Sequence, residues 1–155
     1  CYETGLRSAC LVRWPGVVKP GSEVDAITQN LDFAPMFLAM AGADAPGDMQ
    51  GLDPTPWLRG NTPGDWRDAI YYHYYEFPGA HMVRRHYGVR TDRYKLIHYY
   101  NIDEWELFDL EKDPEELRSV YGDPAYAGIQ EKLEKKLVQL RKQYKVPEKD
   151  PVPGP

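Results

Sequence analysis

The sequence lacks long hydrophobic runs, has few cysteines and carries no excess of positive charge. No stretch of about 18 consecutive apolar residues occurs, which excludes a transmembrane helix. The two cysteines, Cys1 and Cys10, form neither a disulfide framework nor a zinc-binding pattern, so the redox compartment stays open. With 19 Lys and Arg against 24 Asp and Glu, the net charge of −5 argues against a nucleic-acid-binding protein. A globular protein without a nucleic-acid or membrane partner is therefore expected.

The first 42 residues carry the pattern of one strand and one helix. Residues 9–14 (ACLVRW) are a short apolar run before a Pro-Gly turn, which is typical of a buried strand in a parallel sheet. Residues 32–42 place an Asp N-cap before an apolar helical stripe and a Gly after it. Since one strand cannot form a sheet, residues 1–42 are interpreted as the remnant of a larger α/β domain. On this interpretation Cys10 is a small buried hydrophobe rather than a nucleophile.

The middle of the chain changes from loops to strands. Residues 43–68 are rich in Pro and Gly and are predicted to be a loop-rich connector with one short helical turn near Trp57. Eight of the twelve tyrosines then fall within 71–100, in alternating segments typical of strands. We predict four strands, at residues 69–75, 86–91, 94–100 and 105–110. Their close spacing requires antiparallel pairing.

A long amphipathic helix is predicted near the C-terminus. Asp123 is an N-cap and Pro124 occupies the first helical position. Apolar residues then recur at spacings of three and four from Tyr126 to Tyr144, which gives one apolar stripe. A smaller helical cap is predicted at residues 113–116 (DPEE). The expected class is α+β, in which a four-stranded antiparallel sheet packs against this helix over 69–146 and residues 147–155 form a tail.

The loop between the first two predicted strands holds the best candidates for binding. Glu76, His81 and His86 are polar groups on or beside it, and loops on a rigid sheet often carry binding residues. A solvated hairpin without a ligand is the competing interpretation. The four histidines lack the spacing of a metal site. Four arginines could bind an anion such as sulfate through paired N–H donors: Arg84, Arg85, Arg90 and Arg93. For Arg90 and Arg93, nearby acidic residues make ion pairs the better interpretation.

Seven segments resemble, in order, the C-terminal part of the type I sulfatases of the alkaline-phosphatase-like superfamily. The segments are 2–7 (YETGLR), 11–16 (LVRWPG), 30–35 (NLDFAP), 49–51 (MQG), 87–97 (YGVRTDRYKLI), 106–110 (ELFDL) and 113–116 (DPEE). Residues 72–86 look most similar to N-acetylglucosamine-6-sulfatases and other glycan-desulfating members. The resemblance implies that the complete protein hydrolyses sulfate esters, with a sulfated sugar or glycan as its substrate.

The resemblance also implies what other parts of such an enzyme supply. Sulfatases use a formylglycine made from a cysteine in a Cys-x-Pro/Ala-x-Arg motif, together with a calcium ion. Neither Cys1 nor Cys10 lies in such a motif. We therefore expect this chain to be a fragment with no catalytic or metal-binding residue of its own, inactive when isolated. Its missing partner would be an N-terminal catalytic domain, and Glu76, His81 and His86 would form one wall of the sugar pocket. A periplasmic or secreted location is implied in the same way.

Two other interpretations remain open on the sequence. One is a stand-alone carbohydrate- or protein-binding module without catalysis, in which the aromatic sheet serves as a platform for a sugar. The other is a phosphodiesterase or phosphomutase of the same superfamily. A coding sequence that continues upstream with the cysteine motif would favour the sulfatase.

Overall fold

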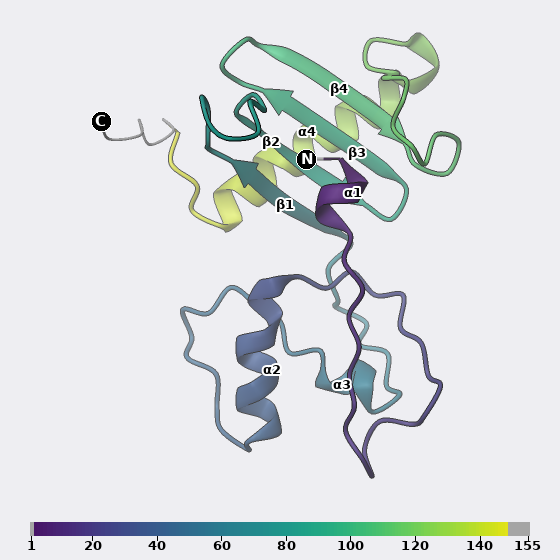
Figure 1. Cartoon of the computed structure of the whole chain (residues 1–155), viewed down its shortest axis with the longest axis vertical. Coiled ribbons are helices and arrows are strands. Elements are labelled where there is room, and N and C mark those ends of the chain that lie inside the picture. The colour runs from purple at the N-terminus through teal and green to yellow at the C-terminus, as the bar shows by residue number, and fades with distance from the viewer. Residues whose placement is uncertain (1, 149–155) are drawn as a thin grey trace. The chain divides into compact units, whose positions relative to one another are not determined.

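The computed structural model describes residues 2–148, which belong to two compact units (Figure 1). The sheet unit comprises Cys1–Arg7 and Ala69–Pro155, and the loop unit comprises Ser8–Asp68. Of the tail predicted at 147–155, residues 149–155 lie outside the described residues. Among residues 2–148, no helix combines the length and apolar composition needed to cross a bilayer.

The sheet unit is built on a four-stranded antiparallel meander, as predicted. Its strands lie in the order β1 (Ala69–Tyr74), β2 (His86–Thr91), β3 (Tyr94–Tyr99) and β4 (Glu104–Asp109). The register pairs Val89 with Leu96 and Leu96 with Leu107. All three are fully buried on one face. A shift of one residue would move them to the other face, so the apolar alternation fixes the pairing.

The long C-terminal helix covers that face, which we call the α4 face. A 3₁₀ turn, η2 (Pro124–Tyr126), leads into α4 (Ala127–Gln143). As predicted, Asp123 caps this start and accepts a 2.9 Å hydrogen bond from the Ala125 N–H. The predicted stripe forms the core with the sheet. Its buried members are Leu133, Leu137 and Leu140.

A short helix, α1 (Glu3–Leu6), lies on the opposite face of the sheet, which we call the α1 face (Figure 1). Alternation places several polar side chains there, including Tyr72, Arg90 and Lys95. The sheet therefore separates an apolar layer under α4 from a polar layer under α1.

The loop unit contains η1 (Asn30–Asp32), α2 (Phe33–Met40) and α3 (Thr55–Leu58). The helix predicted within residues 32–42 and the turn near Trp57 are thereby confirmed. Asp32 is buried and connects three separate segments of the loop unit. Its carboxylate accepts hydrogen bonds from the N–H groups of Gln29 (2.7 Å) and Leu52 (2.8 Å), and it is paired with Arg67.

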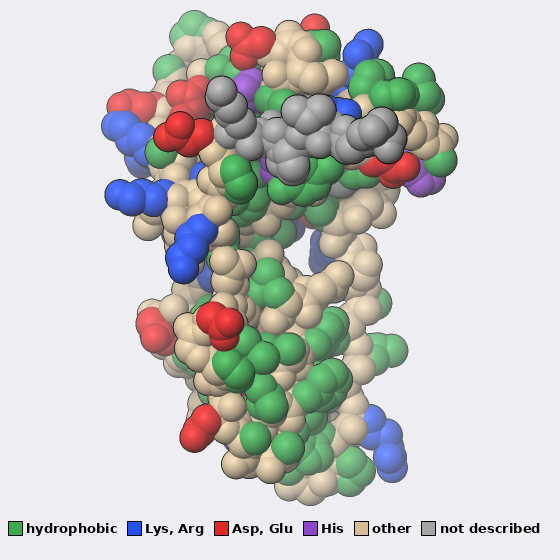
Figure 2. Space-filling view, turned by 90° about the vertical axis from the view of Figure 1, so that its left-hand side faces the viewer, with side chains coloured by type: hydrophobic (Ala, Val, Ile, Leu, Met, Phe, Trp, Pro, Cys, Tyr) green, Lys and Arg blue, Asp and Glu red, His purple; other side chains and the backbone are tan. Residues whose placement is uncertain are grey.

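The strand predicted at residues 9–14 is absent, and these residues run as coil. A strand needs a partner for its backbone N–H and C=O groups, and within the described chain no other segment pairs with this one. Leu11 is 95% exposed. Cys10 is also exposed, so the prediction that it is a buried hydrophobe is wrong. Figure 2 shows hydrophobic side chains gathered on the surface of the loop unit.

Candidate functional site

The β1–β2 loop, residues 75–85, carries two of the three predicted binding residues. The side chains of Glu76 and His81 are exposed on this loop. His86 is the first residue of β2 and is fully buried. The structure therefore places two of the predicted groups at the surface and the third beneath them.

Two arginines at the end of the loop bind the residue near its start. The Arg85 guanidinium donates a 2.6 Å hydrogen bond to the Phe77 carbonyl oxygen. Arg84 lies over the Phe77 ring at 4.5 Å from its centroid. A Cβ atom at Gly79 would lie 2.5 Å from Glu76 Cγ, so the Glu76 side chain lies directly against the loop backbone at this glycine. These contacts fix the loop at both ends.

The His86 imidazole is held in one orientation by aromatic rings and one carbonyl group. Its Nδ1–H donates to the Arg84 carbonyl oxygen at 2.7 Å. The ring stacks on Tyr74 at 5.4 Å and contacts Tyr99 at 5.2 Å. Burial lowers the pKa of His86, which keeps the imidazole neutral near neutral pH. His86 therefore connects the loop to the sheet and positions Arg84.

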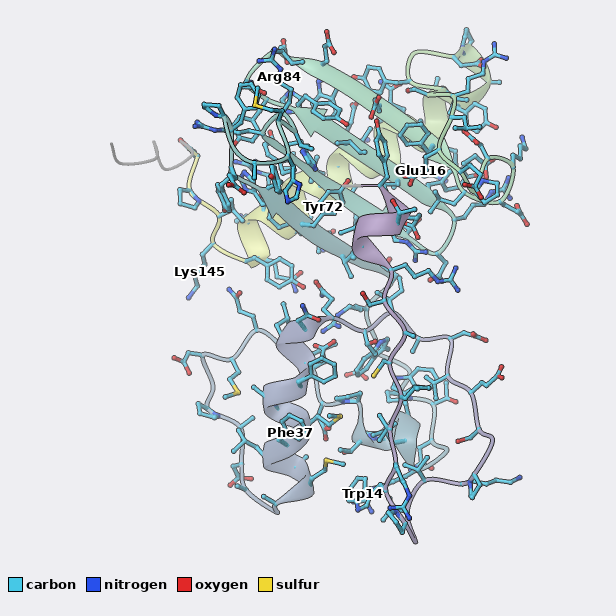
Figure 3. The ribbon with its side chains drawn as sticks, viewed as in Figure 1. Trp14, Phe37, Tyr72, Arg84, Glu116 and Lys145 are labelled. Carbon is cyan, nitrogen blue, oxygen red and sulfur yellow. The ribbon has the colours of Figure 1, made fainter. Side chains whose placement is uncertain are left out.

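Under α1 lies a buried charge cluster centred on Lys95. The Lys95 side chain is fully buried, and its Nζ lies 2.5 Å from Glu116 Oε1 and 3.0 Å from Glu3 Oε1. The Glu3 backbone N–H also donates to Glu116 Oε2 at 2.5 Å. Figure 3 shows Glu116 beside α1. These contacts attach residues 2–7 to the sheet.

The cluster corrects the helical cap predicted at residues 113–116. This segment forms a turn rather than a helix, and Glu116 adopts a left-handed backbone conformation with φ of 54°. Its carboxylate caps no helix because it is needed to compensate the buried charge of Lys95. The signal was present in the sequence as a lysine directly before the apolar pair Leu96 and Ile97 in a predicted strand.

Arg90 extends the cluster on the neighbouring strand. Its guanidinium lies 3.1 Å from Glu3 Oε2, with both side chains largely buried. Burial alone would raise the pKa of Glu3, but hydrogen bonds from Arg90 and Lys95 outweigh it and lower that pKa. The carboxylate is thus held ionised. Arg93 pairs with Asp109 at 2.8 Å on the α4 face, so both arginines form the predicted ion pairs rather than an anion site.

Three tyrosines complete the α1 face. The hydroxyl groups of Tyr2 and Tyr99 donate to Glu106 Oε2 at 3.2 and 3.0 Å. The Tyr72 hydroxyl is buried over Gly88, where a Cβ atom would lie 2.5 Å from it. Burial raises the pKa of Tyr72 well above its ordinary value, so this hydroxyl stays protonated. The face is therefore a polar layer in which tyrosine hydroxyl groups donate to Glu106 and the Tyr72 hydroxyl is buried.

The described residues do not fit the metal centre that the resemblance implies for a sulfatase. Within residues 2–148, no group of three or more His, Cys, Asp or Glu side chains could hold a metal ion. Cys10, in the coil of the loop unit, also lacks the nucleophile motif. The polar groups on and beside the β1–β2 loop stay the candidates for contact with a ligand.

The geometry of the chain is that of known sulfatases. It is 49% identical to an N-acetylglucosamine-6-O-sulfatase of Bacteroides thetaiotaomicron over 93% of its length and 26% of the relative's. A Δ4,5-hexuronate-2-O-sulfatase of the same organism is 32% identical over 74% of this chain and 24% of the relative. The chain thus spans about a quarter of these relatives.

Solved structures agree with the sequence comparison. A protein in complex with its substrate D-glucosamine-2-N,6-O-disulfate matches with a TM-score of 0.85 and 49% identity, over 88% of this chain and 28% of that one. A phosphonate monoester hydrolase from Silicibacter pomeroyi matches with a TM-score of 0.72 and 28% identity, over 85% and 28% of the two chains. Residues 1–143 match the family model described as N-sulphoglucosamine sulphohydrolase, C-terminal. The chain therefore belongs to this sulfatase family, whose C-terminal part it represents.

Proposed function

We propose that the chain is part of a sulfatase that hydrolyses a sulfate ester on a carbohydrate, and that its β1–β2 loop forms one wall of the sugar pocket. The 49% identity to an N-acetylglucosamine-6-O-sulfatase over nearly the whole chain carries this proposal. The ligand of the matching structure, a glucosamine with two sulfate groups, supports a sulfated glucosamine as substrate.

The loop offers three groups with complementary chemistry. The Glu76 carboxylate can accept hydrogen bonds from sugar hydroxyl groups, and the His81 imidazole can donate to or accept from them. Within the described residues, no carboxylate pairs with the exposed Arg84 guanidinium, which leaves its N–H donors available for a sulfate oxygen. We assign Glu76, His81 and Arg84 to direct contact with the sugar. The buried His86 positions Arg84 through the hydrogen bond to its carbonyl group.

The chemical step belongs to groups outside this chain. In the sulfatases that the chain resembles, formylglycine and calcium supply the nucleophile and the charge stabilisation for sulfate ester cleavage. The residues of this chain bind and orient the sugar, and they exclude water from one side of it. The periplasmic or secreted location implied by the resemblance is part of the same proposal.

The test is steady-state kinetics of the full-length protein with N-acetylglucosamine-6-sulfate. His81→Ala and Glu76→Gln are each expected to lower kcat/KM by about tenfold or more, because each removes a hydrogen bond to the substrate. Lys135→Ala, on the exposed side of α4, is the matched control and should change nothing. Unchanged kcat/KM in both loop variants would remove this wall from the pocket.

A second measurement separates the sulfatase from a binding module. The 155-residue chain alone should release no sulfate from the same substrate, whereas the full-length protein should. A full-length protein that binds sulfated sugars but releases no sulfate would replace the sulfatase with the stand-alone binding module.

A further inference from the structure

We propose that the sheet unit carries a second carbohydrate site, which binds an acidic sugar unit of a glycan chain, in the pocket between the end of β4 and the start of α4. This pocket has a volume of about 590 Å³, which lies within the range of small-molecule sites. The proposal depends on the geometry of this pocket and not on the sulfatase assignment.

The pocket walls are fixed by backbone contacts to the sheet. The Val120 N–H donates to the Leu107 carbonyl oxygen at 2.8 Å, and the Leu107 N–H donates to Ser119 Oγ at 3.1 Å. The segment that lines the pocket is therefore attached to the edge of β4. Because this backbone is ordered before a ligand binds, ligand binding requires little further ordering of the wall.

The carboxylates of the pocket are already engaged by the protein. Asp109 accepts two hydrogen bonds from Arg93, at 2.9 and 2.8 Å. Asp113 accepts from the Arg118 N–H, and Asp123 accepts from the Ala125 N–H, each at 2.9 Å. The negative charges that line the pocket are thus compensated by a guanidinium or by backbone donors, which reduces their repulsion of an anion.

The cationic side chains of the pocket, by contrast, have N–H donors available for a ligand. Within the described residues, no carboxylate pairs with the Arg118 guanidinium, which is exposed at the pocket. Lys112 Nζ donates to the Tyr126 hydroxyl at 2.9 Å and lies 3.7 Å from Asp109 Oδ2. The second contact is longer than a hydrogen bond, so the ammonium group has further N–H donors for a ligand. Two cations with free donors in one pocket favour a ligand that carries a sulfate or carboxylate group.

An aromatic stack makes a sugar the ligand rather than a free anion. The rings of His98, Trp105 and Tyr121 are stacked nearly parallel, with centroids 3.9 and 5.8 Å apart. Tyr121 ends the stack and lines the pocket. Pockets that combine an aromatic wall with a few polar groups are typical of small-molecule sites. The pocket therefore offers an apolar ring for the sugar and cations for its acidic group.

The site lies at the opposite end of the strands from the β1–β2 loop. In the antiparallel meander, the end of β4 lies at the same end of the sheet as the start of β1, on the opposite edge, whereas the loop follows the end of β1. A strand of 6 residues spans about 20 Å. Two sites at this separation would let the sheet unit contact two separate sugar units.

The experiment is a titration of the 155-residue chain with a size-defined heparin tetrasaccharide, measured by calorimetry and by amide NMR shifts. We expect shifts at residues 109–126 and affinity at least tenfold weaker in the Arg118→Ala, Lys112→Ala double variant. Lys132→Ala, an exposed lysine of α4, is the matched control and should retain affinity. Inorganic sulfate alone should bind at least tenfold more weakly than the tetrasaccharide.

Three outcomes would overturn the proposal: no binding to the tetrasaccharide, equal affinity for inorganic sulfate, or equal affinity in the double variant and the wild type. Shifts confined to residues 75–86 would assign the binding to the β1–β2 loop instead. None of these outcomes bears on sulfate release by the full-length protein, so a failure here is distinguishable from a failure of the sulfatase assignment.

Discussion

The two units of the chain are stabilised in different ways. The sheet unit has an apolar core between α4 and the sheet, whereas the loop unit depends on one buried carboxylate. In the loop unit the buried apolar residues are Pro35, Met36 and Pro54, whereas the sheet unit buries a cluster of aliphatic side chains under α4. The large side chains of Leu11 and Phe37 are 95% and 61% exposed in the loop unit.

This difference indicates unequal local stability. Buried apolar area contributes roughly 25 cal/mol per Å², while a single hydrogen bond contributes only about 1 kcal/mol net. We therefore expect the backbone amides of the loop unit to exchange with solvent faster than those of β2, β3 and α4. Four changes test this comparison.

The largest effect is expected from Lys95→Met in the sheet unit. Removing the buried cation leaves the Glu116 carboxylate without a cationic partner and leaves Glu3 paired with Arg90 alone, which typically costs about 3–5 kcal/mol. Urea unfolding of the variant measures this cost. Lys135→Ala, which breaks the exposed pair with Glu131, is the control and should cost less than about 0.5 kcal/mol. Equal stability of the two variants would show that the cluster under α1 does not hold the unit together.

Leu137→Ala should come next, at about 2–5 kcal/mol, because it leaves a cavity under α4. Leu137 is 2% exposed, whereas its neighbour Val138 is 69% exposed. Val138→Ala in the same helix is the matched control, with an expected change within about 0.5 kcal/mol. Thermal unfolding of both variants provides the measurement. Similar losses in the two would contradict the division of α4 into a buried and an exposed side.

Asp32→Asn should destabilise the loop unit by about 1–3 kcal/mol and leave the sheet unit unchanged. The substitution weakens charge-assisted hydrogen bonds from Gln29, Leu52 and Arg67. Hydrogen exchange should show lost protection within residues 29–67 only. If protection fell equally in β2 and β3, the two units would unfold together, and the comparison would fail.

The effect that is smallest near neutral pH is a pH dependence within the sheet unit. Burial, and then the charge of Arg141, lower the pKa of His73 from 6.5 to about 4. The unfolded chain therefore binds a proton that the folded one excludes, and stability falls as the pH falls from 6.5 to 4. His73→Phe should reduce this slope, measured by urea unfolding at several pH values. An unchanged slope would assign the dependence to other groups, His86 first, because burial also lowers its pKa.

Most of the sheet unit could be predicted from the sequence because its signals are local. Alternation and the polar breaks between strands placed all four strands to within one residue at each end. The strand predicted at 9–14 failed because pairing is not local, and the apolar pattern alone supplies no partner. The same error explains why Cys10 was wrongly predicted to be buried.

In the candidate site, the sequence predicted correctly only those residues whose exposure follows from their place in a loop. Glu76 and His81 lie on the β1–β2 loop as the sequence indicated, and their role in binding stays a prediction. The burial of His86 depends on rings from β1 and β3 that meet only in the folded register. Glu116 was misassigned because its partner Lys95 lies 21 residues away in the chain.

Residues 2–7 and the residues from Ala69 onward form one unit although Ser8–Asp68 intervenes. When the sheet unit folds, it therefore closes a loop of about 60 residues. The free-energy cost of loop closure grows by about 0.6 kcal/mol per doubling of loop length. Replacing that segment with a flexible linker of about eight residues removes three doublings, or about 2 kcal/mol. With a linker that spans the distance between Arg7 and Ala69 without strain, the shortened protein should therefore have a more stable sheet unit than the 155-residue chain.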